Sequence, residues 1–110
     1  MNEEQKNAKE WFFNLRNDLV NTLEIIEGKK FNFKDWSHSG SGGGTMGSIK
    51  GEIIEKGGVN ISTVSGEFSD KMRSRIPGTE ESAKYWATGI SVVIHPFSPL
   101  IPSMHFNSRY

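Results

Sequence analysis

A short polar segment near the end of the sequence carries the side chains best suited to chemistry. From Ser103 to Tyr110, residues at alternate positions differ sharply in polarity. Because successive side chains of a β-strand point to opposite faces, a strand here puts all its most polar side chains on one face. These are Ser103, His105, Asn107 and Arg109. The opposite face, which is largely apolar, carries Met104, Phe106, Ser108 and Tyr110.

A second pair of polar residues precedes this segment. The run 87–95 is rich in β-branched residues, which predicts a central strand covered on both faces. Three prolines stiffen the connection 96–102 that follows it. If the two strands pair antiparallel, Ser91 and His95 share the polar face, because they are an even number of residues apart.

The residue types on this face predict binding of an anion with several hydrogen-bonding groups. Arg109 can bind a carboxylate through two hydrogen bonds, and Asn107 offers both a donor and an acceptor. Each imidazole can transfer a proton near neutral pH. The combination favours a polycarboxylate ligand. An alternating polar strand is also the ordinary solvent-facing side of an antiparallel sheet, and the sequence leaves that alternative open.

The histidines raise a metal site as a further alternative. His95 and His105 could together hold a divalent metal from adjacent strands. No acidic third ligand lies near them in sequence, and the chain contains no cysteine. His38 is the remaining histidine, so strong metal ligands are few.

Composition excludes several other classes of partner. The chain has 110 residues, enough for one small domain, with 13 basic and 13 acidic residues. No run of five like charges indicates nucleic acid or a membrane surface. No apolar stretch approaches the ~20 residues that cross a bilayer, and the first residues resemble neither a signal peptide nor a transit peptide. These features predict a soluble cytoplasmic protein.

The segment 3–27 is predicted to form a long helix. Apolar residues recur in it at steps of three and four, which places them on one helical face. They are Ala8, Trp11, Phe12, Leu15, Leu19, Leu23 and Ile26. Gly28 is a suitable residue to end the helix. The aromatic residues of this stripe are predicted to pack in the core.

The middle of the chain predicts several short elements. The glycine- and serine-rich segment 37–44 predicts a loop or the entry to a strand, either a flexible linker or backbone that approaches a ligand closely. Strands are expected at 45–50, 52–56 and 59–64, with tight reversals at Gly51 and at Gly57–Gly58. The alternation in the last of these strands separates Ile61 and Thr63 from Asn60 and Ser62.

Ser69 is a candidate cap for a short helix at 70–75, ahead of Pro77. Together the patterns predict an α+β fold: the helix 3–27 packs on an antiparallel sheet with strands within 45–65 and 87–110. The sheet is expected to be incomplete at its C-terminal edge. Because an unpaired apolar edge strand favours association, the chain is predicted to oligomerise or to exchange strands.

The segments 89–96 (GISVVIHP) and 102–110 (PSMHFNSRY) together resemble the signature of the oxygen-dependent coproporphyrinogen-III oxidases. Upstream features are similar to that family in the same order. They are Trp36, the glycines 42–44, Glu55-Lys56, the segment 58–62 (GVNIS) and the segment 66–68 (GEF).

The resemblance implies a specific activity, the oxidative decarboxylation of two propionates of coproporphyrinogen III to vinyl groups. The product is protoporphyrinogen IX, in haem synthesis. Dioxygen would be the oxidant with no organic cofactor, a divalent metal could take part, and members form homodimers. By residue, His105 matches the proposed proton donor, and His95 with His105 match histidines suggested to bind metal. The implied substrate contacts are Ser91, Asn107, Ser108 and Arg109.

The chain departs from the family pattern at two residues and in length. Where this chain has Ser108, many members have tyrosine or another residue, and where it has Ser65, many have histidine. Members also continue well past the strand that contains Arg109, so the chain is expected to be an N-terminal fragment that lacks part of the catalytic machinery. A porphyrin-binding module without turnover and an inactive scaffold therefore remain alternatives. A metal-dependent hydrolase is a weaker one, for want of carboxylates beside the histidines.

Overall fold

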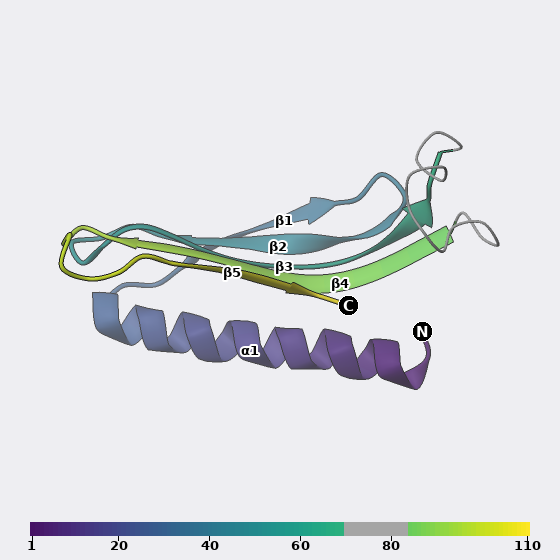
Figure 1. The fold of residues 1–110 in the computed structure, drawn as a ribbon, viewed down its shortest axis with the longest axis horizontal. Helices are drawn as coiled ribbons and strands as arrows, with labels where there is room; N and C mark the ends of the chain where they lie inside the picture. Colours follow the sequence, from purple (N-terminus) through teal and green to yellow (C-terminus); the bar gives the residue numbers. More distant parts are fainter. Residues whose placement is uncertain (70–83) are drawn as a thin grey trace.

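The computed structural model describes residues 1–69 and 84–110, which form one helix and a five-stranded antiparallel sheet (Figure 1). The elements are α1 (Glu3–Glu27), β1 (Asn32–Ser37), β2 (Ser41–Ile49), β3 (Ile54–Glu67), β4 (Lys84–Pro96) and β5 (Met104–Arg109). Helix α1 lies along one face of the sheet (Figure 1). This arrangement confirms the predicted α+β fold.

Helix α1 begins and ends at signals visible in the sequence. The side chain of Asn2 accepts a hydrogen bond from the Gln5 backbone N–H at 2.8 Å, and the Gln5 side chain accepts one from the Asn2 N–H at 3.0 Å. This reciprocal pair is a capping box. Gly28 ends the helix with a φ of 71°, a conformation that glycine adopts without a steric penalty. Among the described residues, no helix is long and apolar enough to cross a membrane.

The strands lie in the sheet in the order β1-β2-β3-β4-β5, so each pairs with its neighbour in sequence. The structure confirms β4 as an interior strand, between β3 and β5. The prediction that it is covered on both faces is wrong within the described residues, because only its α1 side is covered. It also confirms the antiparallel pairing of β4 with β5 across the proline-containing connection. Within the described residues, β1 and β5 form the two edges of the sheet.

The core lies between α1 and the middle strands β3 and β4. Val59 and Val92 are fully buried, and Phe12 of α1 is buried against them in one cluster. Burial of such a side chain stabilises the fold by about 1.5–3 kcal/mol. The prediction that the aromatic residues of the stripe pack in the core is right for Phe12, which is 6% exposed, and wrong for Trp11, which is 60% exposed. Helix α1 covers β3 and β4 alone, so only the centre of its apolar stripe meets the sheet.

Carboxylates near the end of α1 fasten the helix to the sheet. The Glu27 carboxylate accepts hydrogen bonds from the backbone N–H groups of Ile53, at 3.1 Å, and Ile54, at 3.0 Å. The Glu24 carboxylate accepts one from the Phe31 N–H at 2.7 Å. These contacts satisfy backbone donors of the β2–β3 turn and of the segment that enters β1.

Two predictions for the glycine-rich regions need correction. The segment 41–44 belongs to β2, so the flexible-linker alternative is wrong and the strand entry is right. Gly57 and Gly58 lie inside β3, so the predicted reversal there is wrong, whereas Gly51 does lie in the β2–β3 turn. A Cβ on Gly57 would come within 2.6 Å of the Ile49 Cγ2 atom, so this glycine makes room for a core side chain. The predicted helix at 70–75 falls outside the described residues.

Candidate binding face on the open side of the sheet

The face of the sheet away from α1 carries polar side chains in rows across the strands. The strand register and the alternation of side chains define these rows. The first row contains Trp36, Gly44, Ser62, Gly89 and Arg109. The second contains Lys34, Met46, Asn60, Ser91 and Asn107. The third contains Asn32, Ser48, Gly58, Val93 and His105, and Lys56 with His95 lie beyond it. We call this surface the open face.

The structure brings most of the predicted site residues together on the open face. Ser91 pairs directly with Asn107, and Arg109 pairs with Gly89 in the next row. This confirms the predicted sharing of one face by β4 and β5. Ser108 is the exception, because it pairs with Ile90, whose side chain is buried on the α1 side of the sheet. The side chain of Ser108 therefore points away from the other predicted contacts. Ser103 lies just before β5.

A hollow of about 280 Å³ lies over the first two rows of the open face. Its walls include side chains from β1 to β5, among them Trp36, Met46, Asn60, Ser62, Ser91 and Arg109. Gly89 pairs with Arg109 and has no side chain, so the hollow reaches the backbone of the sheet beside Arg109. The hollow offers an aromatic wall, hydroxyl and amide groups, and one cation.

The position of Trp36 explains why residue 44, in the glycine-rich segment 37–44, is a glycine. A Cβ on Gly44 would lie 2.7 Å from the Trp36 Cζ2 atom, so the indole ring packs directly over this residue. A larger residue here would push the ring away from the sheet. The close approach made by this glycine is therefore to a neighbouring side chain. The indole, 38% exposed, presents an apolar surface beside the polar rows.

The two histidines of the open face contact each other. Their Nε2 atoms are 2.5 Å apart, and their ring planes differ by only 11°. His105 pairs with Val93 in the register, and His95 lies two residues further along β4, so this is a diagonal contact between neighbouring strands. One imidazole donates and the other accepts, because a hydrogen bond needs one N–H. The pair can therefore hold a single proton between its two rings.

The described residues do not complete a metal site around this pair. A divalent metal bound by both histidines would need about 2.0–2.1 Å to each nitrogen and usually two further ligands. Within residues 1–69 and 84–110, no group of three or more histidine or acidic side chains is placed to hold a metal. His95 and His105 can supply at most part of a coordination shell.

The charge of the open face favours anions. Arg109, Lys34 and Lys56 contribute cationic groups, and none of the residues in the rows is acidic. Cations aligned on one surface attract carboxylates and can hydrogen-bond to them. The predicted preference for a polycarboxylate therefore fits a surface much larger than the last strand.

Sequence reasoning missed several residues of this surface. Trp36 and Lys34 were not predicted as site residues, because no strand was expected before residue 45. Met46 lies within the expected strand 45–50 but was not assigned to the polar face. Asn60 and Ser62 had already been placed together on one side of a strand. Glycines have no side chain that shows the in-and-out alternation of a strand. Had the alternation been continued backward through the glycines, it would have placed these residues on one face with Asn60 and Ser62.

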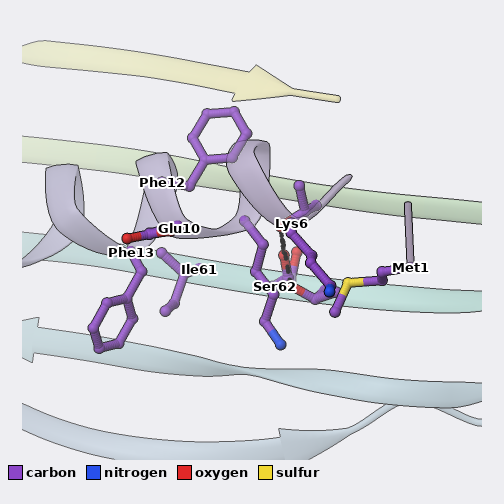
Figure 2. A pocket seen from close by; sticks show the side chains of 10 residues that line it. Met1, Lys6, Glu10, Phe12, Phe13, Ile61 and Ser62 are labelled. Carbon is purple, nitrogen blue, oxygen red and sulfur yellow. Dashed lines mark hydrogen bonds between the residues drawn. The ribbon is translucent and has the colours of Figure 1, made fainter. Parts of the chain in front are cut away.

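The opposite side of the sheet offers a very different cavity. A hollow of about 260 Å³ lies between the first turns of α1 and strands β3 and β4. Figure 2 shows Phe12 and Phe13 of the helix and Ile61 of β3 at this hollow, with Met1 at one end. Its walls are mostly apolar, with Lys6, Lys9 and Glu10 contributed by the helix. Its mainly apolar walls suit a polycarboxylate less well than the polar rows of the open face do.

Comparison with known proteins agrees with the residue pattern. A family model described as coproporphyrinogen III oxidase matches residues 7–110. The chain belongs to the coproporphyrinogen III oxidase family.

Relatives named oxygen-dependent coproporphyrinogen-III oxidase come from several Rickettsia species. The chain is 50% identical to the Rickettsia felis protein over 98% of its own length, and 51% identical to the Rickettsia prowazekii protein over all of it. It is 51% identical to a Rickettsia bellii protein over 91% of its length. These matches cover 42%, 43% and 39% of the relatives, so the chain spans about two fifths of the oxidases it resembles.

Proposed function

We propose that this chain forms the tetrapyrrole-binding part of an oxygen-dependent coproporphyrinogen-III oxidase, with the open face as the surface that holds the substrate. The single observation that carries the proposal is the alignment of Arg109, Asn107 and Ser91 on one uncovered face. Membership of the oxidase family supports the assignment of the ligand. Coproporphyrinogen III carries four carboxylate arms on a broad macrocycle, which fits a broad surface with cations and few projecting side chains.

The proposed reaction shortens two side arms of the substrate. Each propionate loses its carboxylate as carbon dioxide and, from the carbon next to the ring, one proton and two electrons. Dioxygen takes up the electrons, and a vinyl group remains. In this scheme Arg109 binds a carboxylate through its paired N–H groups, and Ser91 with Asn107 orients the arm beside it. Trp36 offers the ring a flat apolar contact at the far side of the first row.

His105 is the proposed proton-handling residue. It lies on the same face as Asn107 and Arg109, two and four residues along β5. Its contact with His95 fixes the orientation of the ring and supplies a place for a proton. A divalent metal would be held by this pair only with ligands from outside the described residues. We assign no substrate contact to the side chain of Ser108, because it points to the α1 side of the sheet.

One observation favours a second candidate, a porphyrin-binding module without turnover. The chain covers about two fifths of its relatives, so groups needed for the oxidation could be contributed by the rest of a full-length protein. Binding by this chain would then survive without reaction. The open face would have the same ligand in both cases.

The free edge of β5 supports self-association. The apolar side of this strand is not covered by α1, and Met104 and Phe106 remain 39% and 36% exposed. A second copy that pairs at this edge would cover both residues and satisfy the open backbone groups. Light scattering across protein concentration should show a mass that rises above 12.3 kDa. A constant monomer mass would contradict the association.

Turnover and binding together test the proposed function. Reduced coproporphyrinogen III is incubated in air with this chain alone, and with the chain plus the C-terminal part of the Rickettsia prowazekii relative. Chromatography measures protoporphyrinogen, and His105→Ala and Arg109→Ala serve as variants. Product that forms only in the mixture, and is lost with either variant, supports the oxidase. Binding without product in either mixture supports the non-catalytic module, and the absence of binding by the wild-type chain contradicts both.

A further inference from the structure

A lysine-lined hollow lies at the β1 side of the open face, and no part of the substrate has yet been assigned to it. It has a volume of about 700 Å³ and lies over β1, β2 and β3. Four lysines line it, together with a single acidic residue. These residues are Lys29, Lys34, Lys50, Lys56 and Glu55.

Two of the lysines, Lys34 and Lys56, lie on strands of the open face and are available to a ligand. The Lys29 ammonium donates a hydrogen bond to the Lys50 carbonyl at 2.7 Å, so it is engaged at the rim. Lys34 and Lys56 form no hydrogen bond and no ion pair with any other group in the described part of the chain. Both lie on the open face by the strand register, Lys34 in the second row and Lys56 beyond the third.

The rest of the hollow suits a hydrogen-bonding anion on a partly apolar arm. Asn32, Ser48 and Asn60 supply amide and hydroxyl groups, and Met46 and Val93 supply apolar surface. Gly58 leaves open space in its middle, because a Cβ there would have no neighbour closer than 3.9 Å. A short aliphatic chain that ends in a carboxylate fits this combination of groups.

The spacing of the cations matches a single ligand that spans the face. Arg109 on β5 and Lys34 on β1 are separated by four strand spacings, or about 19 Å between backbones. Lysine and arginine side chains are long, so their charged groups can approach each other more closely than the backbones do, to the order of a tetrapyrrole with its arms. Met46 and Asn60 line both this hollow and the smaller one beside Arg109, so the two are contiguous.

We propose that Lys34 and Lys56 form a second carboxylate subsite, which binds a side arm of the tetrapyrrole on the side opposite Arg109. This inference rests on the proposed function and adds to it. The subsite selects ligands by the number and placement of their carboxylates. Arg109 holds one arm at β5, and the lysines hold an arm at β1, so the ring lies in one orientation across the sheet.

The test compares two porphyrins that bind without reacting. Coproporphyrin III has four carboxylate arms, and deuteroporphyrin has the same ring with two. Each is titrated into the wild-type chain, Lys34→Gln, Lys56→Gln and the double variant, with visible absorbance as the readout. Lys9→Gln is the matched control, because it removes the same charge from a residue that lines the hollow on the helix side.

We expect each single variant to weaken coproporphyrin binding about threefold and the double variant about tenfold, the size of exposed ion pairs. Deuteroporphyrin binding should change less than twofold, and the effect should shrink at high salt. If binding depends on Arg109 but not on the lysines, or if both porphyrins respond alike, the subsite is wrong while the proposed function stands. If the wild-type chain binds neither porphyrin, the proposed function fails and the subsite fails with it.

Discussion

The two faces of the sheet are formed by the same strands but differ in role: one packs in the core, and the other carries polar residues open to a ligand. On the α1 side, Val59, Ile90 and Val92 are at most 3% exposed and pack in one cluster with Phe12. On the open face, the neighbouring residues Asn60 and Ser91 are only partly buried. A period of two along β3 and β4 thus separates the residues that stabilise the fold from those available to a ligand.

This comparison explains why the binding surface can be polar without weakening the fold. Among the described residues, the buried apolar side chains of the strands lie on the α1 side, where their burial offsets the conformational entropy of folding. The other face can therefore carry cations, amides and glycines, whose substitution should affect binding more than stability. Three pairs of variants and one single variant test this division, in order of decreasing expected effect.

The largest difference is expected between Val92→Asp and Asn107→Asp. Val92 is fully buried, so the first variant places an unpaired carboxylate in the core and should cost about 4 kcal/mol or more. Asn107 is exposed on the open face, so the second variant should change stability by less than about 0.5 kcal/mol. Urea unfolding followed by circular dichroism measures both. Equal losses of unfolding free energy in the two variants would contradict the division between a core face and a binding face.

The adjacent glycines 57 and 58 give a smaller test with matched chemistry. In Gly57→Ala the new methyl meets the Ile49 Cγ2 atom at 2.6 Å, so the variant should lose about 1–3 kcal/mol. In Gly58→Ala the methyl projects into open space, so stability should stay the same or rise slightly. Thermal unfolding of both variants measures the difference. A larger loss for Gly58→Ala would place the core on the wrong side of the sheet.

The hydrogen bonds between Glu27 of α1 and the β2–β3 turn should contribute less to the free energy of unfolding. Glu27→Ala removes the acceptor for the Ile53 and Ile54 N–H groups and should cost about 1–2 kcal/mol. Glu10→Ala, at an exposed position on the same helix, is the control and should be close to neutral. Porphyrin binding on the open face should not change in either variant. A loss of binding with intact folding would show that the two faces are coupled.

The smallest effect is expected at Tyr110, whose hydroxyl donates a hydrogen bond to Glu4 Oε2 at 2.7 Å. This hydrogen bond raises the pKa of Tyr110 above its usual value, with smaller contributions from desolvation and from the Glu4 charge. Because the folded-state pKa is the higher one, the stabilisation is complete below pH about 10 and is lost as the pH rises through the raised pKa.

Tyr110→Phe should therefore melt at a slightly lower temperature than the wild type near pH 8. The difference should vanish at strongly alkaline pH, where the tyrosine of the wild type is ionised. Calorimetry at both pH values measures it. A difference that grows with pH would contradict the hydrogen bond to Glu4.

The sequence predicted those parts of this division that depend on local patterns. The helix at 3–27, the interior strand, and the polar side of the last strand all follow from periods of 3.6 and 2, with Gly28 as the stop. The prediction that Ser91 and His95 share the polar face of the last strand followed from their even spacing and an antiparallel connection, and the register confirms it.

The rest depended on contacts between distant residues. Strand β1 was not predicted. Strand β2 was predicted only from residue 45 onward, because the glycines at 42–44 carry no side chain whose alternation could be seen. Trp36 packs over Gly44, and Ile49 packs over Gly57. Each glycine therefore lets a neighbouring side chain come close to the backbone, whereas the sequence had predicted a loop or strand entry at 37–44 and a reversal at Gly57–Gly58. The lysine-lined hollow required the register of three strands, which no local pattern specifies.

The most direct test of the central claim is to see which face a porphyrin touches. Methionines labelled with ¹³C at the methyl group report on different surfaces: Met46 on the open face, Met1 at the apolar hollow under α1, and Met104 on the apolar side of β5. On titration with coproporphyrin III, the Met46 methyl signal should move strongly in the ring current of the porphyrin, while those of Met1 and Met104 stay in place. A shift of Met1 or Met104 with Met46 unchanged would contradict the open face as the binding surface.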